Sequence, residues 1–179
     1  MVTEKWVREG RETVYRTGFF KVHRDRVLLP DGRRIDYGVV ECGHCVGVLP
    51  VLADGSIVLV RQYRYIAGRA TWEMPTGGVH EGELPELAAQ RELAEEAGYH
   101  AGSLDHLSTY HTSKSSIDET AHLYLGRGLE PAQAEGDDTE FIDTRVFSFE
   151  QVMEMVNSGE ILDSMTLIAV LKFALMRAR

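Results

Sequence analysis

Charged side chains gather within six consecutive positions of one segment, at Arg91, Glu92, Glu95 and Glu96. A helix places residues three and four positions apart on one face, so these glutamates are expected to crowd together. Glu83, just before this helix, adds another carboxylate. Mg²⁺ prefers such oxygen ligands, usually a few carboxylates shared with substrate phosphates. The spacing therefore favours a metal site, although a solvated helix face is the plainer alternative.

The same segment holds its charged residues at fixed distances from two glycines. It reads Gly77, five residues, Glu83, seven residues, Arg91-Glu92-Leu93, one residue, Glu95-Glu96, one residue and Gly98. This order resembles the box of the Nudix hydrolases, and the chain resembles that family over nearly its full length. The only departure is Tyr99, where the family usually has an aliphatic residue. The resemblance implies an enzyme that hydrolyses a diphosphate.

The resemblance also assigns roles to the residues of the box. Glu92 and Glu96, one helical turn apart, are the expected metal ligands, with Glu95 alongside. The family's pattern adds the carbonyl oxygen just before the first glycine, which here belongs to Thr76. Mg²⁺ is the expected cofactor, with Mn²⁺ as the alternative. Arg91 precedes Glu95 by four residues, so the two side chains are expected to pair and to hold that carboxylate in place.

Segments outside the box indicate the class of substrate. Residues 72–78, WEMPTGG, resemble the approach to the box in ADP-ribose and nucleoside diphosphate sugar pyrophosphatases, and residues 60–64, VRQYR, resemble their R-Q-x-R segment. The resemblance implies that Arg64 contacts the substrate phosphates, with Glu73 and Arg61 also on the substrate. Strand arginines are equally common as solvated edge residues. The implied reaction converts ADP-ribose, or a related nucleoside diphosphate sugar, to a nucleoside monophosphate and a sugar phosphate.

Residues 113–119, SKSSIDE, occupy the place of the subfamily's S-P-G-x-x-D-E. Lys114 stands where an ADP-ribose pyrophosphatase usually has proline, and Ser115 replaces the glycine. A lysine can contact a phosphate or a sugar hydroxyl, and the loop loses the rigidity of proline. This departure keeps nucleoside diphosphate sugars other than ADP-ribose open as substrates.

The resemblance further implies an acid in the loop before the last strand, which orients or deprotonates the attacking water. Glu140 is the first choice by its spacing to that strand, and Asp138 the second. An acidic loop is also a normal solvated loop, so the sequence leaves both interpretations open.

Composition excludes other classes of function. The net charge of −9 argues against a nucleic-acid-binding surface, which is normally basic. The N-terminal residues are charged throughout, so no signal peptide is expected. The longest apolar run, residues 165–176, is too short to span a bilayer and contains Lys172. We therefore expect a cytoplasmic protein that binds neither membrane nor nucleic acid.

The only two cysteines, Cys42 and Cys45, form a C-x-x-C that leads directly into a predicted strand. A zinc site needs more ligands, and a redox pair is expected at a helix start. Buried strand cysteines are the favoured interpretation, with the redox pair as the alternative.

Alternating apolar residues predict strands at 11–29, 34–40, 46–52, 57–65, 72–75, 104–111, 119–125 and 142–147. Helices are expected from Pro85 to Gly98, over 149–157 and from the residues after Asp163 to about 177. The buried stripe of the first helix is expected at Leu87, Ala89, Leu93 and Ala97.

This order predicts a mixed α/β (α+β) fold. By resemblance it is the Nudix α/β/α sandwich around a mixed β-sheet, with an N-terminal antiparallel β-hairpin. Residues 1–40 are expected to form N-terminal strands and residues 41–179 the Nudix hydrolase domain. The subfamily forms homodimers through such strands, so a homodimer with a small-molecule nucleotide sugar as its ligand is implied. Two alternatives remain: a Nudix hydrolase of dinucleoside polyphosphates, coenzyme A or an oxidised nucleoside triphosphate, and a sensor that binds a nucleotide sugar without cleaving it.

Overall fold

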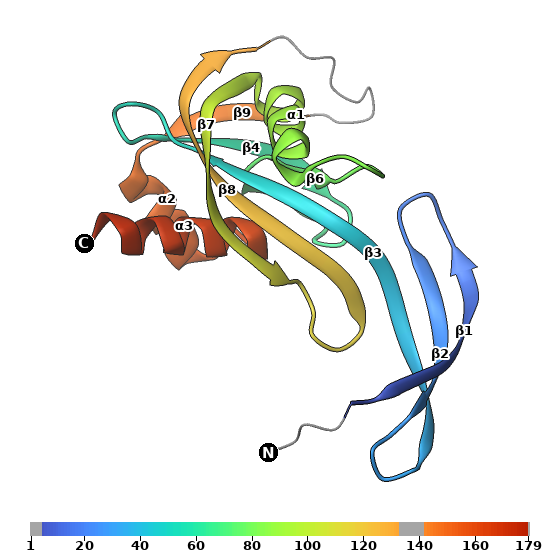
Figure 1. Ribbon diagram of the computed structural model, residues 1–179. Coiled ribbons are helices and arrows are strands. Elements are labelled where there is room, and N and C mark those ends of the chain that lie inside the picture. The colour runs from blue at the N-terminus through green and yellow to red at the C-terminus, as the bar shows by residue number, and fades with distance from the viewer. Residues whose placement is uncertain (1–4, 133–141, 179) are drawn as a thin grey trace. The chain divides into compact units, whose positions relative to one another are not determined.

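The computed structural model describes residues 5–132 and 142–178 (Figure 1). In chain order its elements are β1 (Val7–Arg16), β2 (Lys21–Leu28), β3 (Arg34–Pro50), β4 (Ile57–Arg64), β5 (Arg69–Glu73), β6 (Thr76–Gly78), α1 (Pro85–Ala97), β7 (Tyr99–His111), β8 (Ile117–Pro131), β9 (Asp143–Phe147), α2 (Phe149–Ser158) and α3 (Ser164–Arg177). The predicted mixed α+β class is confirmed. None of the helices in these ranges is long and apolar enough to cross a membrane.

The strands form two sheets. One has the order β1-β2-β3-β8-β7, with β6 paired to β3, and the other has the order β5-β4-β9. β2 and β3 pair antiparallel, which gives the predicted N-terminal hairpin. Two hydrogen bonds, from Val40 N to Ser116 O and from Val51 N to Gly126 O, join residues in or next to β3 and β8 and advance in the same direction along both. These two strands therefore run parallel, and the predicted mixed sheet is confirmed.

The described chain divides into two compact units. The first comprises residues 1–43 and 111–120, and the second comprises residues 44–110 and 121–179. In the first unit β1 pairs antiparallel with β2, and its register shifts at two places. Arg11 binds Asp25 at 2.7 Å and Glu41 at 3.1 Å within this unit. The pKa of Asp25 is held below its usual value by the hydrogen bond from that guanidinium.

The second unit buries apolar side chains on both faces of its strands. Successive β4 residues point to opposite faces: Ile57 and Leu59 join one core with α2 and α3, and Val58 and Val60 join another with α1. All four are fully buried. Figure 1 shows α1 on one side of these strands and α2 with α3 on the other. This two-sided burial is what makes the unit a sandwich.

The helix ends follow local signals. Gly98 ends α1 in the left-handed conformation, as expected, and Leu84 provides no side-chain cap at the start. Ser148 caps α2 in a reciprocal capping box with Gln151, and Asp163 caps α3 by accepting from the backbone N–H of Thr166.

Three predictions about the elements were wrong. Residues 11–29 form parts of two strands, because Thr17 caps a turn around Phe20. The separate strands predicted at 34–40 and 46–52 are one 17-residue strand, β3, so the C-x-x-C lies inside it. Leu87 does not belong to the buried stripe of α1, since its side chain is 60% exposed while Ala88 is fully buried.

Both cysteines of that motif are thiols and are only partly buried. Burial raises the pKa of the Cys42 thiol, and the carboxylates of Glu119 and Asp118 act in the same direction. A thiol with a raised pKa is a poor nucleophile, which argues against the redox alternative.

Candidate functional site

Helix α1 gathers carboxylates around one arginine. The Nη1 atom of Arg91 lies 2.6 Å from Glu92 Oε1 and 3.1 Å from Glu95 Oε2, so the expected contact with Glu95 is present. Its Nε and Nη2 atoms donate to both oxygens of Glu83, each at 3.1 Å. Nη2 also donates to the carbonyl of Gly78 at 2.9 Å. One guanidinium therefore ties the helix to the loop before it and to β6.

The charges in this cluster reinforce one another. The hydrogen bond from Arg91 holds the pKa of the Glu83 carboxyl below its usual value. Glu83 in turn raises the pKa of Arg91, against the opposing effect of partial burial. At neutral pH Glu83 is therefore an ionised carboxylate beside a permanent cation.

Glu96 lies on the buried side of α1 and is only 7% exposed. Its Oε2 atom accepts the backbone N–H of Thr76 at 2.9 Å, and Gln62 Nε2 approaches its Oε1 atom at 3.5 Å. Burying a carboxylate is unfavourable unless donors replace water, and these two groups supply them. Glu96 thus joins α1 to the residue whose carbonyl is the expected metal ligand.

The first glycine of the box is required by close packing. A Cβ atom on Gly77 would lie 2.0 Å from the carboxylate carbon of Glu92, whereas one on Gly78 would meet nothing within 4 Å. The Glu92 carboxylate therefore rests directly against the backbone of β6. A glycine at this place permits the approach that any other residue would block.

The donors of the cluster suit a hard divalent cation. Carboxylate oxygens of Glu92, Glu95 and Glu96 lie on one short helix, and the bare backbone of Gly77 faces one of them. In the two described ranges, however, no three or more acidic, histidine or cysteine side chains converge closely enough to hold an ion. Arg91 contacts two of the three carboxylates on this helix, Glu92 and Glu95. A bound cation would compete with this guanidinium for the same oxygens.

A second acid lies at the end of β5. Glu73 is 3% exposed, and its Oε1 atom accepts from Arg64 Nε at 2.8 Å. Burial raises the pKa of this carboxyl, although the hydrogen bond from Arg64 opposes the shift. Asp163, at the start of α3, adds a repulsive charge that also raises it. The arginine expected on the substrate is therefore already oriented by a buried partner.

Other predicted substrate residues lie elsewhere. Arg61 points to the opposite face of β4 from Arg64, and its guanidinium lies 5.9 Å from the ring centre of Trp72. Lys114 belongs to the first unit, where it lines a hollow of about 360 Å³ with Tyr37. Glu140 and Asp138 lie outside the described residues. The structure thus brings Arg64 to Glu73 and does not bring Arg61 to either.

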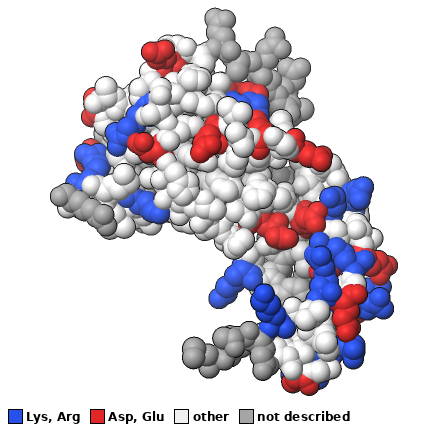
Figure 2. Space-filling view, in the orientation of Figure 1, with Lys and Arg blue, Asp and Glu red and all other residues white. Residues whose placement is uncertain are grey.

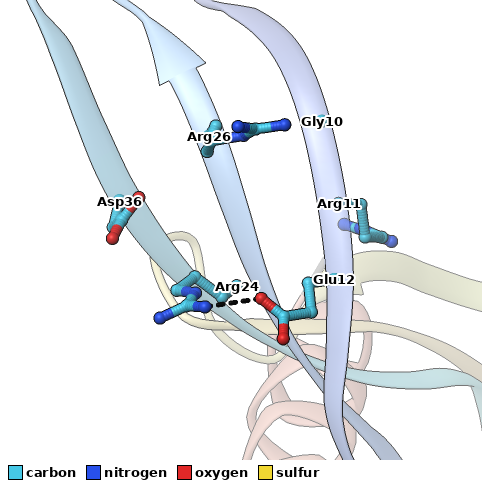
Figure 3. A pocket seen from close by; sticks show the side chains of 6 residues that line it. All are labelled: Gly10, Arg11, Glu12, Arg24, Arg26 and Asp36. Atoms are coloured by element: carbon cyan, nitrogen blue, oxygen red, sulfur yellow. Dashed lines mark hydrogen bonds and ion pairs between the residues drawn. The ribbon is translucent and has the colours of Figure 1, made fainter.

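Another hollow, of about 450 Å³, lies on the N-terminal strands (Figure 3). Arg24 pairs with Glu12 at 2.5 Å in it, and the Arg26 guanidinium lies over Gly10. Figure 2 shows Lys and Arg side chains, mixed with acids, crowded over this part of the molecule. Of the predicted site residues that the structure describes, none lines this hollow.

Two residues of the site were missed by sequence reasoning. Gln62 alternates with Arg61 along β4 and is therefore on the face of Glu96 and Glu73, a position that the R-Q-x-R segment could have revealed. Thr166 is fully buried on α3 and accepts the backbone N–H of Met74, a contact without any local sequence signal.

Comparisons with known proteins agree with this geometry. The NUDIX domain matches residues 43–164, and the nucleoside diphosphate sugar hydrolase N-terminal domain matches residues 6–40. The chain is 31% identical over 163 residues to an ADP-ribose pyrophosphatase of Bacillus subtilis (strain 168), covering 90% of this chain and 88% of that protein. It is 33% identical over 161 residues to a methanol dehydrogenase activator of Bacillus methanolicus, covering 89% and 87%.

A solved structure shows the same fold. The crystal structure of an ADP compounds hydrolase superposes with a TM-score of 0.87 and 22% sequence identity, covering 98% of this chain and 95% of that one. Nudix hydrolases generally depend on divalent metal ions, in keeping with the oxygen donors gathered on α1. With the box, the fold and the matched domains in agreement, the chain belongs to the Nudix family of hydrolases.

Proposed function

We propose that this protein is a Mg²⁺-dependent pyrophosphatase that cleaves ADP-ribose or a related nucleoside diphosphate sugar. The observation that carries the proposal is the α1 cluster, in which Arg91 holds three box carboxylates and Glu96 reaches Thr76. The match of residues 6–40 to the N-terminal domain of nucleoside diphosphate sugar hydrolases supports this class of substrate. Relatives named ADP-ribose pyrophosphatase and GDP-mannose pyrophosphatase support it as well.

In this proposal Glu92, Glu95, Glu96 and the carbonyl of Thr76 hold Mg²⁺, or Mn²⁺ in its place. The bound ion would neutralise phosphate charge and acidify a water molecule. Arg91 contacts Glu92 at 2.6 Å and Glu95 at 3.1 Å, and its positive charge offsets the repulsion between these two carboxylates.

The substrate diphosphate is assigned to Arg64, which Glu73 orients. Water attacks one phosphorus, its oxygen forms the new P–O bond, and the bridging oxygen leaves with the other phosphate. The loop acid, Glu140 or Asp138, takes the proton from the attacking water. Lys114 is proposed to contact the phosphate or sugar, and Arg61 stays a weaker candidate because it lies over Trp72.

The test is hydrolysis of a substrate panel by the purified chain with Mg²⁺. We expect release of AMP and ribose 5-phosphate from ADP-ribose, or the corresponding products from GDP-mannose, by chromatography. Glu96→Gln is expected to abolish turnover, while Glu154→Gln, on an exposed position of α2, is the matched control and keeps it. A wild-type protein inert across the panel would overturn the proposal, and tight binding without products would favour the sensor.

We also propose that the protein forms a homodimer through its N-terminal strands. β1 is the edge strand of its sheet and leaves backbone groups available for a partner. Large apolar side chains around it are exposed, including Tyr15 at 58% and Phe19 at 91%. Light scattering after size-exclusion chromatography is expected to give twice the mass of the chain. The same measurement on Phe19→Ser should show weaker association, and a wild-type monomer at micromolar concentration contradicts this proposal.

A further inference from the structure

We propose that Thr166 and Asp163, at the start of α3, are positioning residues for hydrolysis, because they fix the turn that carries Thr76. This inference rests on the proposed function. Neither side chain is expected to touch the substrate. They act on the backbone of Met74, two residues before the expected ligand, through a chain of hydrogen bonds.

Each hydrogen bond between Met74, Thr166 and Asp163 has a defined donor and acceptor. The Met74 N–H donates to Thr166 Oγ1 at 3.0 Å, and Thr166 Oγ1 lies 2.6 Å from Asp163 Oδ2. The Met74 N–H can only donate, so the hydroxyl accepts from Met74 and donates its own hydrogen to the Asp163 oxygen. The same Asp163 oxygen accepts the backbone N–H of Thr166 at 2.7 Å, which fixes the hydroxyl in place.

Complete burial makes this contact hard to replace. Thr166 and Met74 are both 0% exposed, so water has no access to the Met74 N–H. Losing the hydroxyl would leave a buried donor without an acceptor, and the backbone would move to find one. Gly47 leaves room for this packing, since a Cβ there would lie 2.3 Å from the Met74 methyl group and 3.2 Å from Thr76 Cγ2.

Each residue of the turn is held by a different element. Glu73 accepts from Arg64 on β4, and Met74 donates to Thr166 on α3. The carbonyl of Pro75 accepts the N–H of Val48 on β3 at 3.0 Å. The N–H of Thr76 donates to Glu96 on α1 at 2.9 Å. A shift at Met74 is therefore passed directly to the backbone that meets Glu96.

A purely structural helix cap is the simpler account of Asp163. That cap is complete with the N–H of Thr166 alone. The hydroxyl donates a second hydrogen bond to the same Asp163 oxygen and also accepts from Met74, a residue 92 positions away in the sequence, which a cap alone does not require. The two accounts are separable, because the hydroxyl can be removed while the cap is kept.

The experiment compares Thr166→Val, which keeps the shape and loses the hydroxyl, with Thr166→Ser, which keeps the hydroxyl. Mn²⁺ binding is measured by electron paramagnetic resonance, and exchange of the Met74 amide is measured by NMR in the metal-free protein. We expect Thr166→Val to weaken Mn²⁺ binding and kcat/KM by about 10- to 100-fold, as for other groups that orient a metal ligand, and to expose the Met74 amide to exchange. Thr166→Ser is expected to restore both.

Val170→Ala is the matched control for lost stability, because Val170 is also fully buried on α3. Equal weakening of Mn²⁺ binding in Val170→Ala, at an equal loss of Tm, would overturn the inference. If Thr166→Val does not fold, wild-type exchange decides: added Mg²⁺ must protect the Met74 and Thr76 amides together, and protection of Thr76 alone contradicts the inference. Absence of turnover in the wild type would contradict the proposed function. The amide exchange and Mn²⁺ binding results would still test the positioning role of Thr166, because neither measurement depends on turnover.

Discussion

Gly77→Ala is expected to remove most activity while leaving the fold intact. The new methyl group would lie 2.0 Å from the carboxylate carbon and from one oxygen of Glu92. Ordinary contact begins near 3.4 Å, so the carboxylate must retreat by about 1.4 Å. This movement also breaks its 2.6 Å contact with Arg91. A displacement of about 1 Å at a catalytic site can lower the rate by about 100-fold, or about 2.7 kcal/mol of transition-state stabilisation.

Stability should change little, because the group that must move is the end of a flexible side chain. Gly77 has no positive φ, so its backbone conformation suits alanine. The matched control is Gly78→Ala at the next position, where a Cβ meets nothing within 4 Å. Steady-state kcat/KM with ADP-ribose and thermal unfolding by circular dichroism are measured for both variants. The reasoning fails if the two variants keep equal kcat/KM, or if a crystal structure of Gly77→Ala shows Glu92 unmoved.

Other predictions concern charge and packing. Arg91→Gln is expected to lose about 1–3 kcal/mol of unfolding free energy near neutral pH. The lowered pKa of Glu83 contributes stability that is present above its usual value of 4.5 and is lost as pH falls through the folded value. The difference in unfolding free energy between the wild type and Arg91→Gln, measured by urea titration, should therefore shrink at low pH. An equal loss at every pH contradicts the assignment. Glu73 has a raised pKa, so its ionisation lowers the stability of the wild type as pH rises from 4.5 through the folded value. The unfolding free energy of Glu73→Gln should therefore rise relative to that of the wild type over this pH range. A difference between the two proteins that does not change with pH refutes this prediction. Gly47→Ala should cost about 1–3 kcal/mol by overpacking against Met74, seen as a lower Tm.

Local signals predicted much of the fold. Pro85 and Gly98 set the ends of α1, and Ser148 and Asp163 set the starts of the following helices. These signals act within a few residues, so they can be read along the chain. The division of strands into two sheets depends on distant pairing. The strands predicted at 46–52 and 57–65 follow each other in the sequence, but β3 and β4 lie in different sheets and an isolated bridge joins Val51 to Ile57.

The candidate site shows the same limit. The i, i+4 spacing of Arg91 and Glu95 predicted their contact, because both lie on one helix. Leu87 was wrongly predicted to be buried. The buried stripe of α1 includes a carboxylate, Glu96, so a prediction from apolar residues alone placed the stripe on the wrong side of the helix at this position. The contact of Thr166 with Met74 had no local signal, since the two residues are 92 positions apart.

That separation bears on how activity arises during synthesis. A ribosome that has delivered the chain through Gly98 has already supplied every proposed metal ligand, but not the hydroxyl on α3 that fastens the turn beside them. Arg69 likewise donates a hydrogen bond to the carbonyl of Gly159, which is synthesised 90 residues later. Nascent chains should therefore stay inert until the final helix has emerged and docked, so turnover reports completion of the whole second unit.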